Sequence, residues 1–508
     1  MFKNLFLIKK YSNPLSIEER KILENYFYYE ELSSAKKDFL IKSGQYNKWS
    51  KSRVIDTIDI LYELEEKISS QFYEIDEIII TLEFQLSCIM DAEGDISHSA
   101  SLGHYYYTGL AVDQNLSKAY KFFYKAAKKN DPMALYYLGL MYSNGEHVKK
   151  DPNKGFVYYE KAAKLNHTKA MTMLGLCYDG QGDSKVKKDN ILANSWYLKA
   201  SKLGCEEGQF CLGSSYFKGE GIKQNYSKGL ELFTKSANQG HEGAQYNLGH
   251  IYGTGEGVEQ DSKVAAQWYC KASEQGYADA QFNLGVMYAN GEGVEQDMQE
   301  AAQWYHKAAD QGNANSQYNL GLLYANGEGV EEDIQEAAQW YHKAADQGHA
   351  NSQYNLGLLY EGGEGVEQDM QEAIKYYSKS FALNDAYSGF CIGDIYYHGG
   401  KNISIDYHEA YKWYMKAAKL NDADAQYSLA YLYGKGEGVN MDEDKCIYWM
   451  EKAASNGDKE AREFLGYTEK NSKVSGRALA KIIPLNIKNK NIKVSYNEAA
   501  EAIDLSNV

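Results

Sequence analysis

Apolar residues recur along most of this chain at the spacing of helices that bury one side. Ala280, Leu284 and Tyr288 occupy positions i, i+4 and i+8, so they line one side of a helix. In the segment MQEAAQWYHKAADQG that follows, Ala301 and Tyr305 share a face in the same way. Each stretch has room for about three helical turns. The pattern therefore predicts pairs of short amphipathic helices.

Glycine and aspartate residues mark the expected ends of these helices. The stretch GEGVEQD, or its variant GEGVEED, occurs at 255–261, 291–297, 327–333 and 363–369. We expect Gly291 and Gly293 to stop a helix, since glycine adopts the left-handed conformation without a Cβ clash. Asp297 is then the N-cap of the next helix, and Glu300 completes a capping-box pattern. Although Gly-x-Gly-Val resembles a phosphate-cradling loop, four copies indicate a repeated structural linker.

Two markers show that the helix pairs belong to one repeat. A Leu-Gly step or its equivalent begins at Leu102, Leu138, Leu174, Leu212, Leu248, Leu284, Leu320, Leu356, Ile392, Leu429 and Leu465. A lysine keeps the same period at 125, 161, 199, 235, 271, 307, 343, 379, 416 and 452. The interval between Leu-Gly steps is 36 residues, with one interval of 38 and one of 37. A fixed period of this length is typical of repeat proteins.

Helix pairs this short need contacts with neighbouring pairs to be stable. Isolated helices of this length are marginal in water, and stacked pairs bury their apolar faces against each other. Aromatic residues recur in the second helix and are expected to fill the space between layers: Phe123, Tyr159, Tyr197, Phe233, Tyr269, Tyr305, Tyr341, Tyr377 and Tyr414. The chain is therefore expected to be all-α.

One unit carries a specific family pattern. From Ala278 to Gly312 it reads A-x-A-Q-F-N-L-G-x-x-Y-x-x-G-E-G-V-x-x-D-x-x-x-A-x-x-W-Y-x-K-A-A-x-x-G. This pattern resembles the Sel-one-like repeat family, a branch of the tetratricopeptide superfamily, over about residues 97–466. The resemblance implies a right-handed superhelical solenoid of about ten antiparallel helix pairs that serves as a protein-interaction scaffold. Two loops, in 175–190 and 393–410, depart from the pattern.

The flanking segments lack this period. Residues 1–96 carry helical signals, and Ile75 to Met90 is expected to pack on the first repeat as a cap. Residues 467–508 form a basic tail, with positive charges at Lys470, Lys473, Arg477, Lys481, Lys488, Lys490 and Lys493. This tail is either flexible or docked on the acidic repeats.

Charge and cysteine usage narrow the class of protein. A net charge of -16 counts against nucleic-acid binding, which needs a basic face. The 7 cysteines form no CxxC pairs, which indicates reduced thiols in a cytosol-like compartment. The amino terminus does not read as a signal peptide, and no apolar run is long enough for a membrane span. We therefore expect a cytoplasmic protein, and export by a dedicated secretion system stays compatible with this sequence.

Candidate catalytic chemistry is sparse. There is no HExxH, Walker A, GxSxG or zinc-ribbon spacing, so no cofactor, metal or catalytic residue is expected. The acidic loops lack the ligand spacing of an EF-hand and are interpreted as N-caps. His306 and His342, one repeat apart, are interpreted as exposed helix residues, with a bridging metal as the alternative. The repeated lysines either favour the helix dipole and pack on aromatics or form a phosphate ladder.

Aromatic residues also recur two positions before the Leu-Gly leucine. We name this row the aromatic ladder: Tyr136, Phe210, Tyr246, Phe282, Tyr318, Tyr354, Phe390 and Tyr427. If the first helices line the concave face, as in tetratricopeptide repeats, the ladder faces a groove, together with positions two and five after the leucine. Asn290 and Asn326 lie in a polar row beside it and could bind an extended peptide. The alternative is that the rings complete packing between repeats.

The repeats favour binding over catalysis. Residues 299–324 and 335–360 differ only at Asn313 and His349, and copying a unit lengthens a surface without building a unique active site. We therefore predict a non-enzymatic scaffold for a protein or peptide partner, with partner specificity in 97–220 and 380–435. The alternatives are a bacterial immunity or host-targeting protein with one dedicated partner and a β-lactam hydrolase. The Ser-x-x-Lys match SSAK at 33–36 lies outside the repeats.

Overall fold

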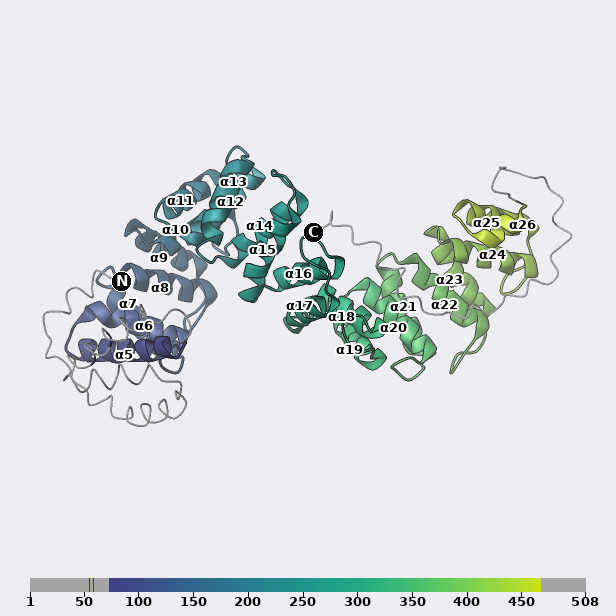
Figure 1. Ribbon diagram of the computed structural model, residues 1–508, viewed down its shortest axis with the longest axis horizontal. Helices are drawn as coiled ribbons and strands as arrows, with labels where there is room; N and C mark the ends of the chain where they lie inside the picture. Colours follow the sequence, from purple (N-terminus) through teal and green to yellow (C-terminus); the bar gives the residue numbers. More distant parts are fainter. Residues whose placement is uncertain (1–53, 55–57, 59–72, 467–508) are drawn as a thin grey trace. The chain divides into compact units, whose positions relative to one another are not determined.

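Helices make up all the regular secondary structure of the part of the chain that the structure describes. The computed structural model describes Val54, Ile58 and residues 73–466, where 22 α-helices and one short 3-10 helix are found (Figure 1). The chain divides into two compact units, residues 1–241 and 242–508. The signals read at the amino terminus and in the basic tail lie outside the described residues.

The first unit contains a leading helix and four helix pairs. The leading elements are α5 (Tyr73–Ala92) and the 3-10 helix η3 (Ile96–His98). The pairs are α6 (Ser99–Thr108) with α7 (Leu116–Ala127), α8 (Pro132–Asn144) with α9 (Pro152–Lys164), α10 (Thr168–Asp179) with α11 (Asn190–Lys202), and α12 (Glu206–Lys218) with α13 (Tyr226–Ala237). Successive pairs pack side by side in chain order (Figure 1).

The second unit contains six further pairs and a closing helix. The pairs are α14 (Glu242–Thr254) with α15 (Ser262–Glu274), α16 (Ala278–Asn290) with α17 (Met298–Asp310), α18 (Ala314–Asn326) with α19 (Ile334–Asp346), α20 (Ala350–Gly362) with α21 (Met370–Ala382), α22 (Ala386–His398) with α23 (Tyr407–Lys419), and α24 (Ala423–Lys435) with α25 (Glu443–Ser455). The chain continues with α26 (Lys459–Phe464). The prediction of an all-α chain with ten tandem helix pairs is confirmed.

Helix caps follow the sequence signals with one exception. The Asp297 carboxylate accepts hydrogen bonds from the backbone N–H groups of Gln299 and Glu300, at 2.9 and 3.0 Å, and so begins α17. The second half of the predicted capping box does not form. The N–H of Asp297 instead donates to the carbonyl of Tyr288 at 2.9 Å, which closes the loop between the two helices. The corresponding bond joins Asp333 to Tyr324.

The two glycines of the GEGV loop have different roles. Gly291 ends α16 in the left-handed conformation, with φ 72°, as expected. Gly293 also has a φ of 72°, but it lies beyond the helix end, against the first residue of α15. A Cβ atom at position 293 would overlap the carbonyl group of Ser262. The second glycine therefore allows the loop to contact the preceding repeat, and the expectation that it stops the helix is wrong.

Glycine and a large aromatic residue interlock inside each of the first nine pairs. The Leu-Gly glycine of the first helix faces the ring of the second-helix aromatic, and in Gly285 a Cβ atom would lie 2.7 Å from ring carbons of Tyr305. These aromatic rings are all buried. In the tenth pair Met450 takes the place of the ring and Ala430 takes the place of the glycine. Tyr269 and Tyr305 also belong to apolar clusters that contain residues of the following pair, which agrees with the expectation that these aromatics fill the space between layers.

Buried glutamines connect one repeat to the next. Gln281 in α16 is 4% exposed, and its amide donates to the carbonyl of Ser273 at the end of α15. Its side-chain oxygen accepts a 2.8 Å hydrogen bond from Gln311, which follows α17. Gln317 and Gln347 repeat the arrangement one unit later. A buried amide with partners on both sides fixes the register of adjacent pairs at little desolvation cost.

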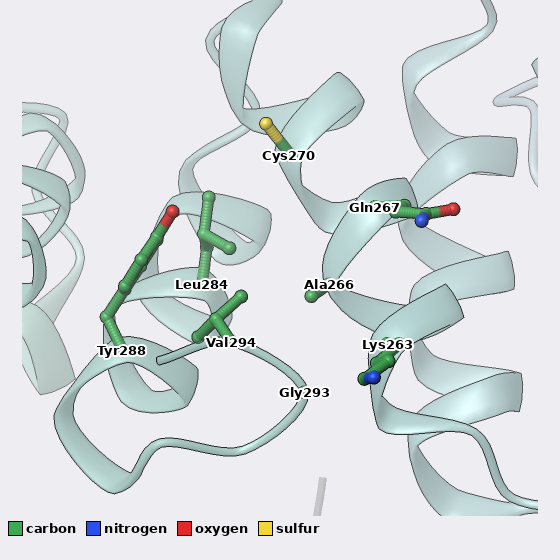
Figure 2. Close-up of a pocket in the computed structure, with 8 residues that line it drawn as sticks. All are labelled: Lys263, Ala266, Gln267, Cys270, Leu284, Tyr288, Gly293 and Val294. Carbon is green, nitrogen blue, oxygen red and sulfur yellow. The ribbon is translucent and has the colours of Figure 1, made fainter. Parts of the chain in front are cut away.

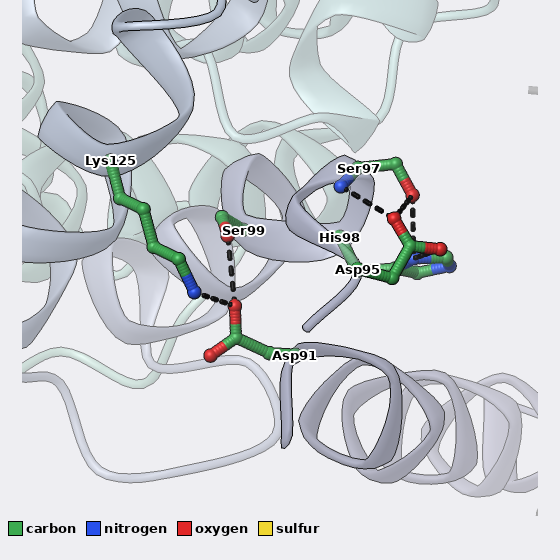
Figure 3. Close-up of polar contacts among 6 residues, drawn as sticks. All are labelled: Asp91, Asp95, Ser97, His98, Ser99 and Lys125. Carbon is green, nitrogen blue, oxygen red and sulfur yellow. Dashed lines mark hydrogen bonds and ion pairs between the residues drawn. The ribbon is translucent and has the colours of Figure 1, made fainter. Parts of the chain in front are cut away.

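The leading helix α5 packs on the first pair. The ring of Phe84 meets Tyr105 and Tyr106 edge to face, with both centroid distances 5.7 Å. At the end of α5, the Asp91 carboxylate accepts from the Ser99 hydroxyl at 2.9 Å and forms an ion pair with Lys125 (Figure 3). One carboxylate thus binds both helices of the first pair.

Candidate functional site

The aromatic ladder lies near the start of successive first helices. Four pairs of neighbouring first helices approach each other more closely than any neighbouring second helices in the described chain: α6 with α8, α10 with α12, α14 with α16 and α22 with α24. First helices therefore lie on the inner side of the stack. Seven of the eight ladder rings are half-buried, and Tyr318 is buried at 7% exposure. The ladder consequently presents partial ring surface on the inner helices.

Seven of the eight ladder rings rest on the buried aromatic of their own pair. Seven such contacts have centroid distances from 5.8 to 6.2 Å: Tyr136–Tyr159, Phe210–Phe233, Tyr246–Tyr269, Phe282–Tyr305, Tyr318–Tyr341, Tyr354–Tyr377 and Phe390–Tyr414. Tyr427 belongs to the tenth pair, where Met450 replaces the buried ring. Packing inside the pair thus fixes the orientation of the ladder.

Several ladder rings also touch the residue that precedes the next first helix. Tyr136 stacks on His167 at 4.7 Å, and Tyr318 meets His349 at 4.6 Å. His349 is at the same time the N-cap of α20, because its Nδ1 accepts from the N–H of Ser352. Contacts between repeats therefore hold part of each ring, and the exposed remainder is the surface open to a ligand.

The two asparagines do not lie beside the rings. Asn290 and Asn326 are the last residues of α16 and α18, whereas Phe282 and Tyr318 lie near the helix starts. Eight residues of helix correspond to about 12 Å. Asn290 is exposed, and its amide makes a long 3.4 Å contact with the Glu292 carboxylate. The asparagines are thus at the loop edge of the inner helices.

An aliphatic row beside the ladder was not singled out from the sequence. Val286, Leu322 and Leu358 occupy the position two after the Leu-Gly leucine in three successive repeats, and all are half-buried. The 36-residue period could have identified this row, because the position two after the leucine recurs in every repeat and was expected to face the groove. The centre of the second unit therefore adds apolar surface to the aromatic ladder.

Acidic side chains appear on the first helices α20 and α22. The Tyr377 hydroxyl donates to Glu361 at 2.7 Å, and the Tyr414 hydroxyl donates to Asp394 at 2.9 Å. Burial raises the pKa of the Glu361 carboxyl. Nearby, burial raises the pKa of Asp422 to about 6. Acidic groups thus replace aliphatic ones along this stretch, which lies at and just before the expected specificity segment 380–435.

His306 and His342 are not exposed helix residues. The Nε2 atom of His306 lies 3.0 Å from the Tyr324 hydroxyl, and that of His342 lies 3.2 Å from the Tyr360 hydroxyl. His342 Nδ1 also meets the Tyr376 hydroxyl at 3.1 Å. Burial lowers the pKa of His342. Both rings are half-buried packing elements, so the expectation of exposure is wrong: the next repeat covers them.

The repeated lysines lie over aromatic rings. The Lys307 ammonium is 3.7 Å from the ring centroid of Trp304, and Lys343 is 3.4 Å from that of Trp340. This contact joins residues three apart on one helix and is a cation–π interaction. The expectation that these lysines pack on the aromatics is confirmed at these positions.

The described part of the chain contains neither a metal-binding cluster nor a membrane-spanning helix. No group of three or more His, Cys, Asp or Glu side chains in the described part of the chain is arranged to hold a metal ion. Among the same residues, no helix has both the length and the apolar character needed to cross a bilayer.

Comparison with known proteins identifies the repeat. The Sel1 repeat model matches ten times, at 100–131, 132–167, 168–205, 207–241, 243–277, 278–313, 314–349, 350–385, 392–422 and 423–458. No curated protein matches the chain at a significant level.

Several solved structures are similar to this chain. A protective antigen present in uropathogenic Escherichia coli strains, which displays an SLR fold, is 32% identical with a TM-score of 0.62, covering 76% of this chain and 81% of that one. A Sel1 repeat protein from Oxalobacter formigenes is 30% identical with a TM-score of 0.47, covering 61% and 88%. An immunity protein from Pseudomonas aeruginosa is 22% identical with a TM-score of 0.26, covering 43% and 83%.

Proposed function

The chain belongs to the Sel1 repeat family, whose members are protein-interaction scaffolds, and on this basis we propose that it binds a protein or peptide partner along the aromatic ladder without catalysing a reaction. One observation carries the proposal. Aromatic rings recur at the same position of eight first helices, seven of them half-buried, and seven of the eight are held in place by a buried ring of the same pair. Fixed aromatic surface of this kind binds ligands at low entropic cost.

The surface suits an extended apolar segment in its middle and a basic segment further along. Val286, Leu322 and Leu358 add aliphatic area next to the ladder in the second unit. Glu361 and Asp394 place carboxylates on the inner helices that follow. A partner peptide with apolar residues followed by lysine or arginine matches this order of chemistry.

The arrangement of titratable groups supports a binding role. The buried hydroxyls and carboxylates of α20 to α23 pair with each other and stabilise the packing, as Tyr377 does with Glu361. A nucleophile beside a general base, with a third group that orients the base, would be the sign of a catalytic site. The proposal therefore assigns these groups to structure and partner recognition.

The test is selection of displayed peptides on the full chain, followed by affinity measurement on variants. Phe282→Leu and Tyr354→Leu keep apolar volume under the surface but remove ring area. We expect each to weaken a selected peptide by roughly tenfold, equivalent to about 1.4 kcal/mol. The control is Tyr448→Ala on the second helix α25, where the exposed ring is outside the ladder.

The affinities of these variants test whether the partner binds along the aromatic ladder. Circular dichroism first establishes that all variants keep the helix content of the parent chain. Unchanged affinity in both folded ladder variants, or an equal loss in the Tyr448 variant, would contradict binding along the ladder. A basic residue placed at the end of the selected peptides should strengthen binding, and Glu361→Gln should remove that gain.

A further inference from the structure

A cavity of about 240 Å³ lies between α15, α16 and the GEGV loop that follows α16. Ala266 and Cys270 of α15 lie opposite Val294 and Tyr288 (Figure 2), and Gln267 also borders the cavity. The remaining lining residues are Lys263, Leu284 and Gly293. The cavity is thus formed where the second helix of one repeat meets the first helix and loop of the next.

The repeats themselves show why this junction is hollow. The eight lining positions recur one and two repeats later, and six of them carry the same residue in all three copies. The two that differ are 263, where Lys replaces the Gln of positions 299 and 335, and 270, where Cys replaces His. The shorter side chain of Cys270 therefore marks the difference between this junction and its two neighbours.

The two histidines show which group fits such a space. His306 reaches from α17 to the Tyr324 hydroxyl, with its Nε2 at 3.0 Å, and its ring meets Trp340 edge to face at 5.4 Å. His342 makes the corresponding bond to Tyr360 at 3.2 Å. Tyr288 is the equivalent tyrosine of the cavity. Among the described residues, none forms a hydrogen bond with its hydroxyl group.

We propose that the cavity binds the imidazole ring of a histidine side chain supplied by a partner polypeptide. The ring takes the place that His306 and His342 occupy in the next two repeats, and one ring nitrogen pairs with the Tyr288 hydroxyl. The Cys270 thiol, which contacts the Glu274 carboxylate at 3.6 Å, serves as a small lining group.

Lys263 adds a charge requirement to this site. It is exposed at the cavity, and its ammonium group has no ion-pair partner in the described part of the chain. The two neighbouring junctions have a neutral glutamine at this position. A partner histidine followed by an acidic residue satisfies both the tyrosine hydroxyl and the ammonium group.

This site is separate from the aromatic ladder. Tyr288 and Phe282 are six residues apart on α16, which places them about 120° apart around the helix axis. The proposal therefore does not depend on peptide binding along the ladder, and either can fail alone.

The experiment uses the full chain and blocked pentapeptides observed by saturation-transfer NMR. The peptide Gly-Gly-His-Glu-Gly should receive saturation at its imidazole protons, and Gly-Gly-Ala-Glu-Gly should receive none. Cys270→His should abolish the signal, because the chain then fills its own cavity as the next two repeats do. Cys270→Ala is the matched control and should keep the signal.

Two further variants test the polar contacts. Tyr288→Phe should weaken the histidine peptide about fivefold, the effect of one hydrogen bond. Exchange of the peptide Glu for Gln should weaken binding to the parent chain but leave binding to Lys263→Gln unchanged. Full signal in the folded Cys270→His variant, or an equal signal from the alanine peptide, would overturn the proposal.

Discussion

Gly285 of α16 lies so close to Tyr305 of α17 that a Cβ atom on the glycine would be 2.7 Å from two ring carbons. The same opposition of a glycine and an aromatic ring occurs twenty residues apart in most pairs, for example between Gly249 and Tyr269. Only the tenth pair combines Ala430 with Met450. The size of one residue thus determines what the other position tolerates.

We predict that Gly285→Ala destabilises the second unit by about 1–3 kcal/mol through overpacking. Tyr305→Met should also destabilise, because it leaves a cavity. The double variant copies the tenth pair and should lose less stability than the sum of the two single changes. A double-mutant cycle from urea denaturation measures the coupling. Strict additivity would show that the two positions do not determine each other.

The glutamine connection is incomplete after α20. Gln353 donates to Ala345, but its side-chain oxygen is buried without a partner among the described residues. Leu383, half exposed, stands where Gln311 and Gln347 donate in the repeats before it. We predict that Leu383→Gln raises the free energy of unfolding by about 1 kcal/mol, since it satisfies a buried acceptor.

The reverse substitution, glutamine to leucine, can be made at the equivalent position of the preceding repeat. Gln347→Leu removes the donor to Gln317 and should cost about 1–2 kcal/mol. Thermal denaturation monitored by circular dichroism compares both variants with the parent chain. If Leu383→Gln proves neutral or destabilising while Gln347→Leu costs nothing, these glutamine side-chain bonds do not contribute to stability.

Asp422 gives the fold a pH dependence of known sign. Its carboxylate accepts from the N–H of Ala425 at 2.7 Å as the N-cap of α24, and burial first, then Asp424 and Asp385, raise its pKa to about 6. The folded state therefore holds the proton more tightly than the unfolded state. This contribution to stability is present at low pH and is lost as pH rises through about 6.

We predict that Asp422→Asn, which keeps the cap acceptor, is more stable than the parent chain at pH 7. Between pH 7 and pH 5 the parent should gain about 1 kcal/mol relative to this variant. Asp131→Asn at the cap of α8 is the control for loss of a capping charge. Parallel stability curves for the parent and the Asp422 variant from pH 7 to 5 would contradict the prediction.

The lysine–tryptophan contacts should stabilise individual second helices. Lys343 lies over Trp340, a ring that is only 4% exposed, so Lys343→Gln should cost about 0.5–1 kcal/mol. Lys235 is the matched control, because it lies three residues after Leu232 and pairs with Glu231 at 2.6 Å. The cost of Lys235→Gln should vanish in high salt. The cost of Lys343→Gln should persist there, and its disappearance would indicate a simple surface charge effect.

The helix pairs and the ladder could be placed from the sequence because their signals are local. Asp297 and Gly291 act within a few residues of their own position, and they begin and end helices as predicted. The ladder positions follow from the period alone. The capping box failed where a longer contact competed, since the Asp297 N–H reaches Tyr288, nine residues back.

The number of helix pairs, the residues that begin and end them and the recurrence of the aromatic row follow from the sequence alone, because turn chemistry and the apolar period act over less than one repeat. How each ring is held, the coverage of His306 and His342 and the cavity beside Cys270 become visible only in the folded chain. Those outcomes depend on side chains that come from the other helix of the pair or from the next repeat. Stacking of the helices brings these side chains into contact, and a local sequence pattern does not predict which side chain fills the space between two helices.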